Sequence, residues 1–166
     1  MKSDNKNEIF PIVDEAGKVV GRATRGECHS GSRLLHPVVH LHVYDAQRRL
    51  YLQRRPEWKD IQPGKWDTAV GGHIDYGENV EEALRREARE ELGLTGFEAE
   101  YLTSYVFESD REREYVNVFR TTVAPDAVNP SDELDGGRWW TAEEIAASAD
   151  MLTPNLRQEL QRLQLI

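Results

Sequence analysis

The segment from Gly72 to Leu94 constrains the fold more than any other part of the chain. Its central stretch, Asn79 to Leu92, contains no proline or glycine and is rich in Ala, Leu, Glu and Arg, which are good helix formers. Gly93 follows at the position where a glycine in the left-handed conformation commonly ends a helix. The segment therefore predicts a helix of about four turns, preceded by a turn that contains glycine.

Two neighbouring stripes run along the expected helix. Glu87, Glu90 and Glu91 stand at i, i+3 and i+4, so their carboxylates emerge on one face. Crowded carboxylates repel one another in water, but they become favourable around a hard cation such as Mg²⁺, which also takes phosphate oxygens. The alternative is a solvated acidic face that the arginines of the same helix balance. The apolar stripe, which would seat the helix on a core, consists of Val80, Ala83, Leu84, Ala88 and Leu92.

The same segment resembles the signature of the Nudix hydrolases, G-x5-E-x7-R-E-U-x-E-E-x-G-U, in which U is a bulky aliphatic residue. One position departs from this signature, because Ala88 is small where a bulky residue is usual. With the signature otherwise complete, we interpret the acidic stripe as an exposed metal-binding cluster rather than a merely solvated face. The residues that match the fixed positions are Gly72, Glu78, Arg86, Glu87, Glu90, Glu91 and Gly93.

The resemblance implies a hydrolase of diphosphate linkages that depends on Mg²⁺ or Mn²⁺. It implies that Glu87, Glu90 and Glu91 are metal ligands, and the carbonyl oxygen of Gly71 is a further candidate. Glu87 is the leading candidate for the general base. Arg86 is expected to orient the carboxylates through a bidentate contact. The expected catalytic residues are therefore Glu87, Glu90 and Arg86.

A second set of residues, outside the signature, resembles type I isopentenyl diphosphate isomerase, a relative that shares the Nudix fold. That isomerase holds a divalent metal with three histidines and a Glu-x-Glu pair. Such a set suits a transition-metal ion such as Mn²⁺ or Zn²⁺, so the resemblance predicts a second metal site. Taken singly, each residue has an ordinary alternative in a loop, a turn or a charged segment. The matching residues are His29, His36, His73, Glu112 and Glu114.

The catalytic cysteine of the isomerase aligns with Gly71, which has no side chain and cannot exchange a proton with carbon. The only cysteine, Cys28, is far away in the sequence and does not replace it. We therefore prefer a hydrolase. An isopentenyl diphosphate isomerase-like enzyme and a catalytically silent nucleotide-binding domain remain the alternatives. Glu108, Glu112 and Glu114 remain open as an additional ligand or as the base.

Short strands surround the expected helix and further helices end the chain. Capping residues open these last helices at Thr141 and at Thr153-Pro154. On the strand 38–44, Val39, Leu41 and Val43 share one face, and His40 and His42 share the other. The expected strands cover residues 9–13, 18–22, 38–44, 50–54, 66–70, 97–107, 115–123 and 138–140.

This pattern predicts an α/β fold, and the resemblance makes it a Nudix-type α/β/α sandwich with a central mixed β-sheet and the helix of the signature, the box helix. We expect residues 1–7 to form a flexible tail and residues 8–166 to form a single domain. The substrate is expected to be a small organic diphosphate, such as a nucleoside diphosphate. Trp58, Trp66 and Tyr105 are candidates for lining its pocket, although aromatic residues near loops often serve packing.

The overall composition limits the partners and the compartment. The net charge of −9 argues against a nucleic-acid partner. No apolar run is long enough for a membrane span, and no secretory signal is visible. A single cysteine excludes an intrachain disulfide, so a cytoplasmic location fits. A homodimer is left open.

Overall fold

The structure of this chain is a computed structural model that describes residues 7–58, 63–131 and 136–166. Its strands are β1 (Ile9–Val13), β2 (Val19–Thr24), β3 (Leu35–Tyr44), β4 (Leu50–Arg54), β5 (Trp66–Thr68), β6 (Val70–His73), β7 (Glu100–Glu108), β8 (Arg113–Thr122) and β9 (Gly137–Trp140). Its helices are α1 (Arg25–Cys28), α2 (Val80–Leu92), α3 (Ala142–Ala147), α4 (Pro154–Arg162) and the short 3₁₀ helices η1 (Pro125–Ala127) and η2 (Ala149–Met151).

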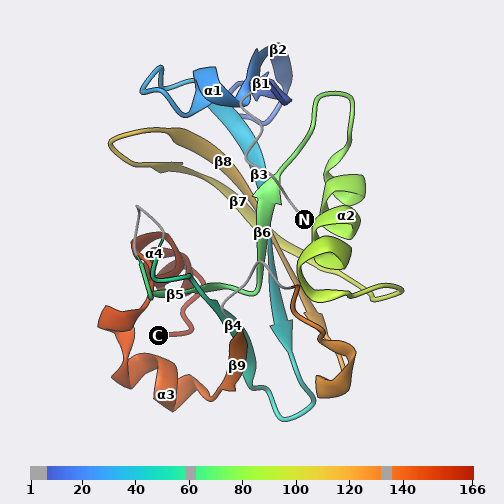
Figure 1. Cartoon of the computed structure of the whole chain (residues 1–166), viewed down its shortest axis with the longest axis vertical. Coiled ribbons are helices and arrows are strands. Elements are labelled where there is room, and N and C mark those ends of the chain that lie inside the picture. Colours follow the sequence, from blue (N-terminus) through green and yellow to red (C-terminus); the bar gives the residue numbers. More distant parts are fainter. Residues whose placement is uncertain (1–6, 59–62, 132–135) are drawn as a thin grey trace.

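Within the described ranges, seven strands form one mixed sheet between two layers of helices (Figure 1). The sheet has the order β5-β4-β3-β8-β7, and β6 pairs with β3 while β9 pairs with β4. The helix α2 covers one face, and α3 and α4 lie on the other side. β1 and β2 form a separate two-stranded sheet next to α1. These features confirm the expected α/β/α sandwich with a mixed central sheet.

Side chains alternate along β3 between the two faces of the sheet. Val39, Leu41 and Val43 are fully buried in the core cluster that also holds the apolar stripe of α2. His40 and His42 point to the opposite face, where both form hydrogen bonds with α4. The expected separation of an apolar face from a histidine face is therefore confirmed.

Local sequence sets both ends of α2, which is the box helix. Asn79 caps the first turn: its side chain accepts a hydrogen bond from the backbone of Glu82, whose carboxylate accepts one from the backbone of Asn79. Gly93 ends the helix with a φ of 65°, in the left-handed region that glycine adopts without strain. The predicted boundaries of this helix are confirmed.

The other layer rests on leucines of α4. Leu156 and Leu160 are fully buried in a cluster with Leu52 and Trp140 of the sheet. Leu163, just after α4, packs at the edge of a different cluster and is only partly buried.

Several strands start at other residues than the sequence predicts, with the largest differences at β3 and β7, and the expected strand 66–70 is divided into β5 and β6. β3 begins at Leu35 rather than at Val38, because it pairs in parallel with β8 from Leu35 onward. His36 therefore lies inside a strand and is fully buried. β7 begins at Glu100 rather than at Phe97, since the Phe97 ring packs into the core beside α2.

Residues 1–6 of the expected tail lie outside the described residues, as do residues 132–135 in the connection before β9. No helix in the described ranges combines the length and the apolar character needed to cross a membrane.

Two consecutive glycines of β6 differ in the room they leave for a side chain. A Cβ atom at Gly72 would lie 2.0 Å from Oε2 and 2.6 Å from Cγ of Glu87 on α2. A Cβ atom at Gly71 would first meet the ring of His40, at the ordinary contact distance of 3.5 Å. The close approach of α2 therefore requires glycine at position 72, whereas packing does not require it at position 71.

Gly72→Ala is expected to lower the free energy of unfolding by about 1–3 kcal/mol, the usual cost of forcing extra atoms into a packed interior. Gly71→Ala is the matched control and should change it by less than about 0.5 kcal/mol. Urea denaturation of both variants measures the difference. Equal stabilities would show that α2 and β6 are not in tight contact.

Candidate functional site

Arg86 lies at the centre of the carboxylates of α2. Its guanidinium donates two hydrogen bonds of 2.8 Å to the carboxylate of Glu78, one of 2.5 Å to Oε1 of Glu87 and one of 3.0 Å to the carbonyl oxygen of His73. Oε2 of Glu90 is 3.5 Å from the nitrogen that binds Glu87. Arg86 thus makes a bidentate contact with Glu78, whereas Glu87 and Glu90 both lie next to a single nitrogen of its guanidinium.

The three glutamates expected to hold a metal occupy different environments. Glu87 is 1% exposed and lies against Gly72, so the expectation of an exposed cluster is wrong for this residue. The reason is the close approach of β6, which covers the carboxylate. Glu90 is exposed, and half-buried Glu91 accepts a hydrogen bond of 3.3 Å from the side chain of Gln53.

Among the described residues, two groups of potential metal ligands bring their donor atoms within 4.8 Å of one another, and neither includes a carboxylate of α2. Arg86 draws Glu87 and Glu90 toward itself, while Glu91 contacts Gln53. A guanidinium therefore supplies part of the positive charge among these carboxylates.

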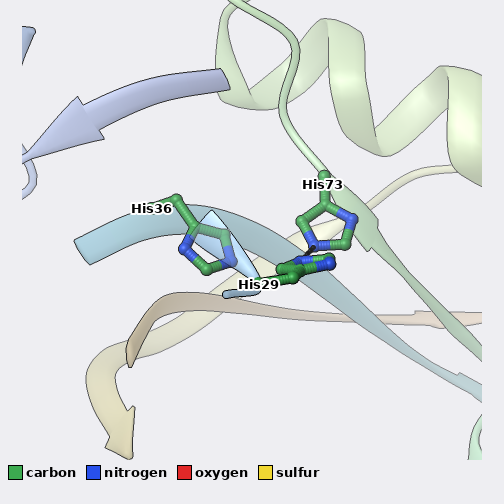
Figure 2. A group of neighbouring side chains, drawn as sticks. All are labelled: His29, His36 and His73. Atoms are coloured by element: carbon green, nitrogen blue, oxygen red, sulfur yellow. Dashed lines mark hydrogen bonds between the residues drawn. The ribbon is translucent and has the colours of Figure 1, made fainter. Parts of the chain in front are cut away.

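One of the two groups consists of His29, His36 and His73, here called the histidine cluster. Figure 2 shows the three rings turned toward one another from different parts of the chain. Nε2 of His29 lies 3.2 Å from Nε2 of His73. The structure therefore brings together the three histidines that the sequence places far apart.

Local structure explains how each histidine reaches the cluster. His29 is the C-terminal cap of α1, and its backbone N–H donates to the carbonyl oxygen of Arg25. His36 lies on β3, where its Nδ1 donates a 3.1 Å hydrogen bond to the carbonyl oxygen of Leu34. This bond leaves Nε2 of His36 with a lone pair. His73 ends β6, and the ring of Phe10 from β1 stacks on it at 4.5 Å.

The two glutamates of the predicted set lie beside the cluster. Oε2 of Glu112 is 3.1 Å from Nε2 of His29 and 3.6 Å from Nε2 of His36. Glu114 is the register partner of His36 across β3 and β8, and its Oε2 is 4.0 Å from the same nitrogen. All five residues of the predicted set therefore gather at one place.

The donor set and its spacing fit a transition-metal ion. Two ligands bound at 2.0–2.2 Å to one ion lie roughly 3.0–3.5 Å apart, close to the separations of His29 from His73 and Glu112. Nε2 of His36 is buried and forms no hydrogen bond with any described residue. Burial lowers the pKa of His36, which favours the neutral form that binds metals.

The surroundings of Glu112 and Glu114 disfavour the ionised form of both carboxylates. Burial and the neighbouring Glu112 raise the pKa of Glu114 to about 7. Burial also raises the pKa of Glu112. A bound cation would relieve the cost of holding two half-buried carboxylates close together.

A further buried acid, Glu159, was missed by sequence reasoning. Glu159 of α4 is fully buried and accepts hydrogen bonds from His40, His42 and Tyr105. The pair of histidines on the face of β3 that points away from the apolar core was the available signal. It indicated a polar face of the strand but not the partner of the histidines, which lies in the last helix.

Other expected site residues have ordinary roles in the structure. Trp66 packs edge-on against Trp140 at 5.1 Å between ring centroids, and Tyr105 is buried in a core cluster. Trp58 is 73% exposed. Glu108 lies outside the histidine cluster, where it forms ion pairs with arginines of neighbouring segments. Cys28 is buried in a small cluster with Phe10 and Ala23.

Comparisons with known proteins agree with this geometry. The family model described as the NUDIX domain matches residues 34–163. An uncharacterized Nudix hydrolase of Yersinia pestis is 37% identical over 149 residues, which cover 89% of this chain and 81% of that protein. An isopentenyl-diphosphate Delta-isomerase of Clavibacter michiganensis is 32% identical over 153 residues, which cover 89% of this chain and 78% of that protein.

Among solved structures, the DR0079 protein of Deinococcus radiodurans superposes on this chain with a TM-score of 0.78 and 27% identity. The superposition covers 93% of this chain and 98% of that one. The isomerase-named relative agrees with the branch that the histidine set suggests. Enzymes of the matched family generally act on diphosphate-containing substrates with divalent ions such as Mg²⁺. This chain belongs to the Nudix hydrolase family.

Proposed function

We propose that this chain is a Mg²⁺- or Mn²⁺-dependent hydrolase that cleaves a diphosphate linkage in a nucleoside diphosphate or another organic diphosphate. The observation that carries this proposal is the arrangement around Arg86, which binds Glu78 and Glu87 and lies 3.5 Å from Glu90. This arrangement holds carboxylates of fixed orientation beside Gly72. Water is the proposed nucleophile, and it attacks a phosphorus atom of the linkage.

The proposed metal ligands are Glu87, Glu90, Glu91 and the carbonyl oxygen of Gly71. Glu90 has an exposed side chain and only a 3.5 Å contact with Arg86, so a rotation is enough to turn it toward an ion. A bound Mg²⁺ or Mn²⁺ would offset the negative charge that develops on the phosphate oxygens.

Glu87 is the proposed general base. It is buried, and the hydrogen bond from Arg86 to Oε1 fixes the orientation of its carboxylate. A base must be held within hydrogen-bonding reach of the proton it removes. The geometry around Gly72 supports this role, since the backbone at position 72 leaves no room for the carboxylate to move toward β6.

We also propose that the histidine cluster, with Glu112 and Glu114, forms a second metal site for an ion such as Mn²⁺ or Zn²⁺. Its spacing, the buried Nε2 of His36 and the two half-buried acids support this proposal. In the absence of a cysteine at position 71, its role is structural, or it positions a phosphate group.

An isopentenyl diphosphate isomerase-like activity is the second candidate, because the isomerase-named relative and the histidine cluster favour it. Gly71 argues against it, since it offers no acid or base. The space at this position is large enough for a Cβ atom, so packing alone does not require glycine there. A catalytically silent nucleotide-binding domain is a third possibility, and the complete signature argues against it.

Glu90→Gln and Glu91→Gln are each expected to lower kcat/KM about 100-fold or more, because each removes a charge that acts on the reacting phosphate. Phosphate release with Mg²⁺ measures this after a screen of nucleoside diphosphates, nucleotide sugars, dinucleotide cofactors and isoprenoid diphosphates has identified the substrate.

Glu81→Gln is the matched control on the same helix. Its carboxylate bonds to Arg85 on the surface, and exposed pairs of this kind contribute little. This variant should keep the wild-type rate. Wild-type turnover in Glu90→Gln or Glu91→Gln on the identified substrate would rule out the metal role of that residue.

Incubation with isopentenyl diphosphate in deuterated water separates the two enzyme classes. No deuterium is expected in the carbon skeleton, because Gly71 supplies no group that exchanges a proton with carbon. Mass spectrometry of the recovered isoprenoid measures the incorporation. Labelled dimethylallyl diphosphate formed at an enzymatic rate would replace the hydrolase assignment by the isomerase.

Glu112→Gln is expected to weaken Zn²⁺ or Mn²⁺ binding at the histidine cluster at least about tenfold. Glu108→Gln is the control, because Glu108 lies close in sequence but pairs with arginines instead. Binding should also weaken below about pH 6.5, where free histidine becomes protonated. Calorimetric titration of metal ions into the metal-free protein measures the affinity of each variant and its dependence on pH. Equal metal affinities of the two variants would contradict the second metal site. The carboxylates of α2 would then remain the one proposed metal centre.

A further inference from the structure

A buried network on the α4 side of the sheet is not used by the proposed reaction. Its centre is the carboxylate of Glu159, which accepts hydrogen bonds of 2.8 Å from Nδ1 of His40, 2.5 Å from Nε2 of His42 and 2.5 Å from the hydroxyl of Tyr105. Burial would raise the pKa of Glu159, but the two histidines outweigh it and hold this pKa well below its usual range. The carboxylate is therefore ionised, and its neighbours donate to it.

The two histidines of this network are not equivalent. The His42 side chain is 1% exposed, and its second nitrogen, Nδ1, is buried without a hydrogen bond to any described residue. The His40 side chain is 11% exposed. Its second nitrogen, Nε2, also makes no hydrogen bond with a described residue, yet it is not among the fully buried atoms. One edge of the His40 ring is thus open.

The open edge of His40 lies beside Gly71. The two residues are register partners in the antiparallel pair of β3 and β6, so a side chain at position 71 would stand next to the ring. A Cβ atom there would be 3.8 Å from Nε2 of His40. Because residue 71 is glycine, no side chain of β6 covers this nitrogen.

The same opening lies next to the histidine cluster. His73 is the register partner of Val38, two residues before His40, and it points to the same face. Diagonal neighbours of this kind have Cα atoms roughly 7–8 Å apart. A ligand held at His73 therefore lies within the reach of His40.

The charge of the network determines whether the second ring nitrogen of His40 is a hydrogen-bond donor. An ionised carboxylate in the interior requires a compensating positive charge. Nδ1 of His40 donates to this carboxylate at 2.8 Å, so the His40 ring is placed to carry that charge. With Nδ1–H bound to Glu159, the free group of the charged ring is Nε2–H, a donor suited to an anionic oxygen.

We propose that His40, held in place by Glu159, is a substrate-binding residue that donates Nε2–H to a phosphate oxygen of the diphosphate, and that Gly71 leaves the space for this contact. The inference rests on the proposed function for the chemistry of the ligand. A purely structural contact with Glu159 is enough to explain His42, whose ring is enclosed. It does not explain why Nε2 of His40 is left uncovered opposite Gly71.

The test uses methylenediphosphonate with Mg²⁺, a diphosphate analogue that is not hydrolysed. His40→Gln is expected to weaken its binding about tenfold or more, the effect of losing a hydrogen bond to a charged group. His42→Gln removes the other histidine contact with Glu159 and should leave the affinity within about twofold. Gly71→Ala covers Nε2 without touching Glu159, so it should also weaken binding. Calorimetry gives the affinities, and the melting temperature of each variant shows that it is folded.

Side-chain ¹⁵N spectra of the histidines give a second measurement. If the role of His40 were only structural, its ¹⁵N shifts would not change when the analogue binds. Nε2 of His40 should shift when the analogue is added, and both nitrogens of His42 should not. Equal affinities of His40→Gln and the wild type, no shift at His40, or no binding of the analogue to the wild type would each overturn the proposal. Because the analogue is not cleaved, binding through His40 without hydrolysis of any substrate would refute the proposed function alone.

Discussion

Both candidate sites depend on the alternation of side chains along β3. This strand pairs with β8 along its whole length and with β6 and β4 on its other edge. Val39, Leu41 and Val43 seat the box helix, while His36 and His40 face the other layer. A slip of one residue would exchange the two sets. The buried apolar face therefore fixes the register that also aims the histidines.

The short strand β6 lies between two different electrostatic environments. On one side Gly72 contacts Glu87, and Arg86 balances the carboxylates of the box helix. On the other side His73 belongs to a cluster in which imidazoles surround Glu112. The first arrangement keeps its acids paired with a permanent cation. The second gathers imidazoles and half-buried acids, which are the donor groups of the metal site proposed above.

Local signals predicted those features that depend on neighbouring residues. Capping residues and apolar spacing gave the ends and the buried face of the box helix, and the resemblance gave the five residues of the second site. Features that depend on distant contacts were not predictable. The start of β3 depends on the parallel partner of Leu35, which is Arg113. The partner of His40 lies 119 residues further along the chain, at Glu159.

The two-stranded sheet of β1 and β2 is separate from the main sheet, yet it supplies part of the surroundings of the histidine cluster. Phe10 of β1 stacks on His73, and the backbone of Ile9 accepts a hydrogen bond from Tyr76. His29 follows directly after this sheet and α1. Local opening of such a small unit costs less than global unfolding. Opening of this hairpin would therefore expose the histidine cluster while the box helix and the central sheet stay folded.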